Sequence, residues 1–251
     1  MHFVPGYSMM AATATTFMLS MIFLLLSAQS KKQYMRFWGI SWLVYSAMFL
    51  LDFCHLNWNF IYLGYVMLRQ MLALLGSYTF LLGTHHFFQI KCPSALGLAA
   101  IISTVSMVLY PAFPPVYTLM IIPNIIFSSG LLIYAGCMFI AISWTQKLPE
   151  KLIASFLIIL WSIFINHFAF SLKNQQLEIG SYFISIFTVN VLILTLIIIY
   201  FKKLRFIDTK QHNRFRLLVE NSSDSMFLYD YKRQQFEYIS PGISSLIGIS
   251  E

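Results

Sequence analysis

The stretch KKQYMRFWGISWLVYSAMFLLDF, residues 31–53, decides the fold. It begins with basic residues, and between Arg36 and Asp52 it has no charged side chain. A helix needs about 20 mostly apolar residues to cross the hydrocarbon of a bilayer, which is about 30 Å thick. The stretch therefore predicts a membrane-spanning helix with a basic end and an acidic end.

The same pattern recurs along the chain. Hydrophobic residues make up 59% of the 251 residues and charged residues only 10%, too apolar a composition for one water-soluble core. We expect an all-α membrane protein with a seven-helix transmembrane bundle. The predicted spans are residues 5–28, 36–53, 59–84, 94–110, 115–144, 151–171 and 180–201.

Basic residues between the spans predict the orientation, because short cytoplasmic loops collect Lys and Arg. Nine such residues fall on one side of the predicted membrane, and only Lys173 falls on the other. The nine are Lys31, Lys32, Arg36, Lys91, Lys147, Lys151, Lys202, Lys203 and Arg205. We expect the amino terminus outside and the carboxyl terminus in the cytoplasm. A cleaved signal peptide is the alternative for the first span, although a basic segment before it is missing.

The net charge of +7 is concentrated in the membrane part. Residues 1–206 contain eleven Lys and Arg against three Asp and Glu, whereas residues 207–251 contain five against six. This distribution predicts contact with lipid headgroups and no nucleic-acid partner. Three cysteines indicate no disulfide framework. With no catalytic motif or metal-ligand spacing, we expect no catalytic residue, metal or cofactor in this chain.

Polar residues inside the spans are the candidate functional residues, because burying them in hydrocarbon is costly unless they are paired. Arg69 is predicted near the middle of the third span, four residues after Tyr65. Two interpretations stay open: a structural ion pair with Asp52, or a ligand pocket in which Arg69 anchors an anionic or carbonyl group. The predicted pocket comprises Asp52, His55, Tyr65, Arg69, Asn124, His167 and Asn190.

Histidine and tryptophan allow further interpretations. Asp52 and His55 share one helix face, where they would hold a proton, a metal or a ligand amine. We interpret His85 and His86 as contacts to lipid headgroups. Tryptophans commonly anchor helices at the membrane interface, and Trp38, Trp42, Trp58 and Trp144 are interpreted in this way.

The composition changes after residue 201. Residues 202–214 are predicted to form a signalling helix or linker, followed by short strands around residues 226–229 and 236–239. The strings SSDSMFLYD (222–230) and FEYISPGISSLIGISE (236–251) resemble the beginning of a PAS domain. Two strands and a helix cannot close a PAS core, so residues 215–251 are expected to be an incomplete α+β, PAS-like segment.

The membrane part resembles the seven-helix sensory modules of bacterial signalling proteins. RFWGISWLVYSAMFLLD (36–52) and LRQMLALLGSYTFLLGT (68–84) carry this resemblance. It implies a sensory domain over residues 1–201 in the bacterial inner membrane, a homodimer, and a small-molecule or lipid-soluble signal. It also implies a histidine kinase as the output of the intact protein. The alternatives are the input region of a diguanylate cyclase, or a small membrane transporter in which Arg69 and Asp52 line the path.

Overall fold

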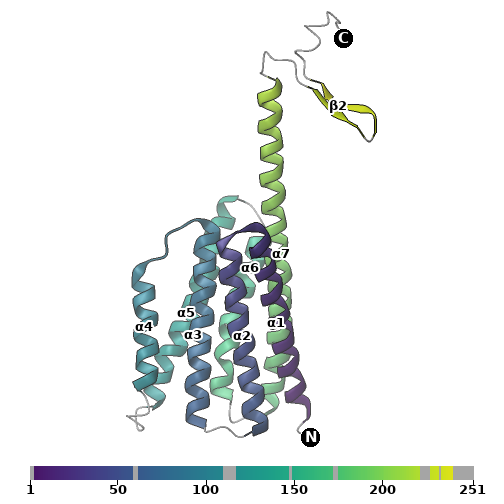
Figure 1. Cartoon of the computed structure of the whole chain (residues 1–251). Helices are drawn as coiled ribbons and strands as arrows, with labels where there is room; N and C mark the ends of the chain where they lie inside the picture. Colours follow the sequence, from purple (N-terminus) through teal and green to yellow (C-terminus); the bar gives the residue numbers. More distant parts are fainter. Residues whose placement is uncertain are drawn as a thin grey trace, which may run out of the picture. The chain divides into compact units, whose positions relative to one another are not determined.

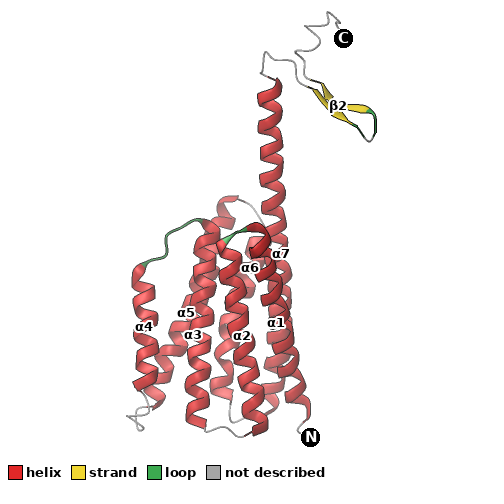
Figure 2. Cartoon of the chain, viewed as in Figure 1, coloured by secondary structure: helices red, strands yellow, loops and turns green. Residues whose placement is uncertain are grey.

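The computed structural model describes residues 3–58, 62–109, 117–146, 149–171, 175–220, 227–231 and 233–239. Over these residues the chain forms seven helices and one two-stranded hairpin (Figures 1 and 2). Contacts divide it into two units, residues 1–196 and residues 197–251.

A helix occupies each of the seven segments that the sequence predicted as apolar spans. The helices are α1 (Phe3–Ser30), α2 (Gln33–Trp58), α3 (Tyr62–Phe88), α4 (Ser94–Leu109), α5 (Tyr117–Gln146), α6 (Pro149–Ser171) and α7 (Gln175–Glu220). Among the described residues, α1, α2, α3, α5 and α7 are long and apolar enough to cross a membrane. The chain is therefore a helical membrane protein, as its composition predicted.

The helices of residues 1–196 form an antiparallel bundle (Figure 1). Helix α2 packs between α1 and α3, α3 also packs against α5, and α5 packs against α6, while α4 makes fewer contacts at the edge. The α1–α2 and α3–α4 connections lie at the same end of this bundle (Figure 1). Exposed Lys31, Lys32 and Lys91 are in these two connections, so two of the predicted basic connections lie at one end of the bundle. Lys147 and Lys173 lie outside the described residues.

The α1–α2 and α3–α4 connections begin with left-handed residues. Lys31 has a φ of 53° and Gln89 a φ of 59°. The amide of Lys31 donates to the carbonyl of Ser27 at 2.8 Å, which satisfies a carbonyl that the end of α1 leaves open. The chain thereby reverses in a few residues and returns as an antiparallel neighbour.

Aromatic side chains fill the interface between α2 and its neighbours. Trp38, Trp42 and Tyr45 are completely buried, and Trp42 and Tyr45 both contact the ring of Trp161 on α6. The interpretation of Trp38 and Trp42 as interfacial anchors was therefore wrong. Their spacing with Tyr45 and Phe49 places all four rings on one face of α2, and that face packs inside the bundle.

Small residues on α3 make room for these rings. A Cβ at Gly76 would lie 2.7 Å from Cε1 of Tyr45, and one at Gly83 would overlap the indole ring of Trp38. Two hydrogen bonds cross the same interface: Ser41 Oγ donates to the carbonyl of Gly76 at 2.8 Å, and the Tyr45 and Ser77 hydroxyls are 3.1 Å apart. Close helix approach and interhelical hydrogen bonds are the usual stabilising contacts between membrane helices.

In residues 197–251, α7 continues to Glu220, and a hairpin follows. The predicted hairpin is confirmed: β1 (Phe227–Asp230) pairs antiparallel with β2 (Gln235–Ile239), with an irregularity between Leu228 and Tyr229. The segment expected as a signalling helix, residues 202–214, lies within α7, and it is almost entirely exposed. The part of the PAS-like segment after residue 239 lies outside the described residues.

We predict that Gly76→Ala and Gly83→Ala each destabilise the bundle by about 1–3 kcal/mol, because the added methyl group forces buried rings to move. Thermal unfolding of the purified chain in detergent measures this. Gly130→Ala is the matched control, since a Cβ there meets nothing within 4 Å and alanine favours the helix. Equal melting temperatures for all three variants would contradict the described packing of α2 on α3.

Candidate functional site

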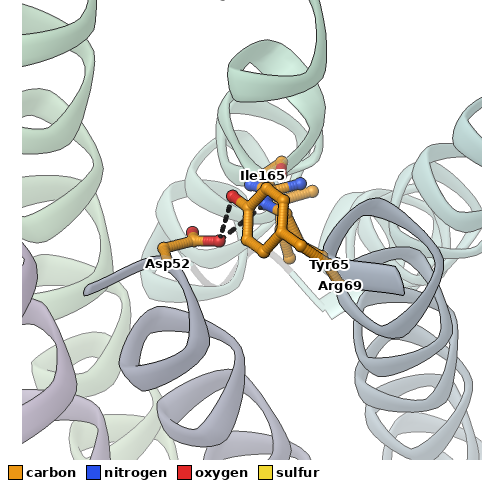
Figure 3. Close-up of polar contacts among 4 residues, drawn as sticks. All are labelled: Asp52, Tyr65, Arg69 and Ile165. Carbon is orange, nitrogen blue, oxygen red and sulfur yellow. Dashed lines mark hydrogen bonds and ion pairs between the residues drawn. The ribbon is translucent and has the colours of Figure 1, made fainter. Parts of the chain in front are cut away.

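Four of the predicted pocket residues come together between α2 and α3, and Figure 3 shows three of them, Asp52, Tyr65 and Arg69. Asp52 and His55 lie in the last two turns of α2, and Tyr65 and Arg69 lie in the first turns of α3. Residues four apart on a helix are neighbours on one face, so Tyr65 and Arg69 reach the same partner. The antiparallel arrangement of the two helices brings both pairs to the end of the bundle opposite the basic connections (Figure 1).

The centre of the site is an ion pair between Arg69 and Asp52. Nε of Arg69 donates to Oδ1 of Asp52 at 3.0 Å, and the Tyr65 hydroxyl donates to the same oxygen at 2.8 Å. Asp52 is 1% exposed, and Tyr65 and Arg69 are each 3% exposed. A carboxylate this deeply buried stays charged only with a cation and hydrogen-bond donors beside it, and both are present.

The guanidinium of Arg69 also connects the pair to α6. Its Nη2 atom donates to the backbone carbonyl of Ile165 at 3.1 Å. One arginine thus ties α3 to α2 through a side chain and to α6 through the main chain (Figure 3). Sequence analysis missed this partner, because every residue has a carbonyl and the side chain of Ile165 gives no signal.

His55, in the last turn of α2, contacts Tyr65. Its ring stacks on the ring of Tyr65, with centroids 3.8 Å apart and an interplanar angle of 6°. His55 is half-buried, whereas the other three members of the network are buried. We call Asp52, His55, Tyr65 and Arg69 the outer network, because they lie near one end of the bundle and not at its centre.

The other predicted pocket residues lie on other helices. Asn124 is buried in α5 at 3% exposure, and Asn190 is half-buried in α7. His167 belongs to α6, but its side chain lies outside the described residues. The structural interpretation of Arg69, pairing with Asp52 across the second and third helices, is confirmed by the ion pair. A ligand-binding role stays a prediction.

Further polar groups that the sequence analysis left out line the buried face of α3. Gln70, Ser77 and Thr84 are all buried, and the spacing of seven residues puts them on one face. Neither side-chain atom of Gln70 has a hydrogen-bond partner among the described residues. The interval of seven residues between these three polar side chains is visible in the sequence and would have identified them.

His85 is placed differently from what the sequence predicted. It is 2% exposed, and its ring lies 5.8 Å from that of Tyr134 on α5, so its interpretation as a headgroup contact was wrong. His86 is exposed and stacks on Phe37 with centroids 5.0 Å apart. Adjacent helical residues point about 100° apart, which sends one histidine into the bundle and the other out of it.

In comparisons with protein-family models, with curated proteins and with solved structures, the chain matches none of them. Within the described ranges, no group of three or more His, Cys, Asp or Glu is placed to hold a metal ion. The function therefore has to be argued from the outer network and from the helices that it joins.

We predict that Asp52→Ala destabilises the chain by about 3–5 kcal/mol, because it leaves the Arg69 charge in a buried site without its carboxylate. The double variant Asp52→Leu with Arg69→Met is expected to recover most of this loss. Unfolding in detergent, followed by circular dichroism, measures both.

Arg233→Ala is the matched control for these variants. Its ion pair with Asp230 spans 3.8 Å, and the Arg233 side chain is 71% exposed, so removal should change stability by about 0–1 kcal/mol. Equal effects of Asp52→Ala and Arg233→Ala would show that the Arg69–Asp52 pair is not the buried interaction described above.

Proposed function

We propose that this chain is the membrane-embedded sensory input region of a bacterial signalling protein whose output is a histidine kinase. In this proposal the chain lies in the inner membrane, with seven spans, the amino terminus outside and the basic connections in the cytoplasm. The signal acts at the outer network and changes how the helices pack. The observation that carries the proposal is the continuity of α7.

Helix α7 contains a buried part and an exposed part in one uninterrupted element. Thr188, Leu192 and Leu196 are buried among residues 1–196, whereas residues 204–218 of the same helix are exposed. A helix without a break transmits a shift or rotation of one end to the other. This is what an input region needs in order to bias a domain that follows it.

The outer network supplies the element that a signal would act on. It joins α2, α3 and α6 through a single arginine, and it is buried, so its contacts change together. A signal shifts the balance between two packing arrangements only if it interacts with them unequally. A group that changes the charge at Asp52 or Arg69 meets this condition, because the pair depends on both charges.

The hairpin supports the proposed position of a PAS domain. Strands β1 and β2 follow α7 at the place where the PAS-like strings predicted two strands. PAS domains in bacterial sensors stand between a membrane input and an output domain, which is the order that this chain would require.

The coding frame beyond Glu251 tests the proposed output. We expect it to continue through the remaining PAS strands into a histidine kinase domain. A diguanylate cyclase domain would change the output and keep the sensory role. A stop codon directly after Glu251 would contradict the proposal, because two strands cannot close a PAS core.

The orientation is tested at Cys92, which lies in the α3–α4 connection. In a variant with Cys54→Ser and Cys137→Ser, Cys92 is the single cysteine. We predict that a membrane-impermeant maleimide labels it in inside-out vesicles and not in right-side-out ones.

Burial raises the pKa of the Cys92 thiol. Since the thiolate is the reactive form, labelling in inside-out vesicles should still increase at pH values where an ordinary cysteine has reached its full rate. Labelling in right-side-out vesicles alone would reverse the proposed topology.

A further inference from the structure

Helix α7 carries a long apolar stripe that the described residues of the chain leave uncovered. From residue 194 to residue 218 its members alternate at intervals of three and four, and one more lies seven residues earlier. We call this set the α7 seam, and none of its side chains is buried. Its members are Phe187, Leu194, Ile197, Phe201, Leu204, Asp208, Gln211, Phe215 and Leu218.

The other side of α7 is the one that packs within residues 1–196. Thr188, Leu192 and Leu196 are at most 1% exposed, whereas Phe187 and Leu194, between them in the sequence, are exposed. At 3.6 residues per turn the buried positions lie on the opposite side of the helix from the seam. The chain therefore uses one face of α7 for its own packing and leaves the seam for another contact.

The seam changes its surroundings after residue 201. Residues 187–201 contain no charged side chain, whereas residues 202–216 contain seven, which do not suit hydrocarbon. Apolar side chains in lipid need no further cover, but Phe215 and Leu218 lie in the charged part and are 63% and 73% exposed. Large apolar side chains grouped on one face in water favour burial against a partner.

The sequence of α7 limits what this partner can be. The helix has no Pro or Gly between Ser181 and Glu220, the residues that usually bend a helix sharply, so it is not built to turn and lie on the bilayer surface. Intervals of three and four match the seam of another helix with the same repeat. A second copy in the same membrane provides such a helix, parallel and at the same depth.

We propose that the α7 seam pairs with the seam of a second copy of this chain in a parallel two-stranded coiled coil. In a two-fold pair each seam position faces the same position of the other copy. Gln211 suits this arrangement, because a carboxamide both donates and accepts, and polar seam residues fix the register. The inference goes beyond the proposed function, since it requires neither a signal nor an output domain.

Disulfide cross-linking in membranes tests the pairing. In the full chain with the three native cysteines replaced by alanine, Phe215→Cys and Leu218→Cys are made one at a time. Isolated membranes are oxidised with copper phenanthroline and analysed on a denaturing gel without reductant. We expect a shift from the monomer to the dimer band in both variants, because seam positions of the two copies face each other closely enough for a disulfide.

Phe206→Cys is the matched control. Phe206 is 69% exposed, close to the value for Phe215, but it is two residues from both Leu204 and Asp208 and so lies on the far side of α7 from the seam. A helix with its side chains is about 10–12 Å across, so two such cysteines would be separated by both helices of the pair. This variant should stay in the monomer band.

Two further changes in the Phe215→Cys chain probe the seam at a distance. Leu204→Asp should abolish the dimer band, because it places facing carboxylates in an apolar layer. Asp208→Leu should strengthen the band, because it removes facing carboxylates from the middle of the seam. Both residues are exposed, so the fold of the single chain does not depend on them.

A monomer band in both Phe215→Cys and Leu218→Cys overturns the proposal. Equal cross-linking of Phe206→Cys overturns it too, because random collision would then explain the dimer. So does a dimer band that Leu204→Asp leaves unchanged or that Asp208→Leu weakens. If the seam cross-links as expected but the coding frame contains no signalling domain, the proposed function fails and the pairing stands.

Discussion

The structure depends on keeping one ion pair charged inside a membrane bundle. Arg69 and Asp52 have opposite charges 3.0 Å apart at almost no exposure, and either charge alone would be very costly there. Tyr65 and the Ile165 carbonyl supply the additional hydrogen bonds that such a pair requires. Because these partners come from α2, α3 and α6, the requirement for pairing also fixes how the three helices meet.

The packing between α2 and α3 places the pair correctly. Large rings on α2 fit against glycines on α3, and the hydroxyls of Ser41, Tyr45 and Ser77 form hydrogen bonds across the same interface. This contact is close and directional, so the register of α2 on α3 is well determined. The aromatic rings also reach Trp161 on α6, which links the same three helices as Arg69 does. A change at the outer network would therefore act on a connected set of helices.

Much of this organisation was predictable from the sequence, and the failures have clear physical causes. The lengths of the apolar segments predicted the seven helices, and the distribution of Lys and Arg predicted that the α1–α2 and α3–α4 connections lie at one end of the bundle. The cost of burying Arg69 pointed to Asp52. Trp38, Trp42 and His85 were misplaced, because aromatic and histidine side chains suit both an interface and an interior, and only packing decides between them. The Ile165 carbonyl was unpredictable, since main-chain acceptors leave no trace in a sequence.

The central claim is that Arg69 couples the Asp52 carboxylate of α2 to the main chain of α6. Hydrogen–deuterium exchange tests it directly, in peptides covering residues 160–171 of the wild type and of Asp52→Asn, both in nanodiscs. The account predicts faster exchange in this part of α6 in the variant, although the substitution is on α2, because a neutral amide holds Arg69 less firmly against the Ile165 carbonyl. Identical exchange in the two proteins would contradict the coupling.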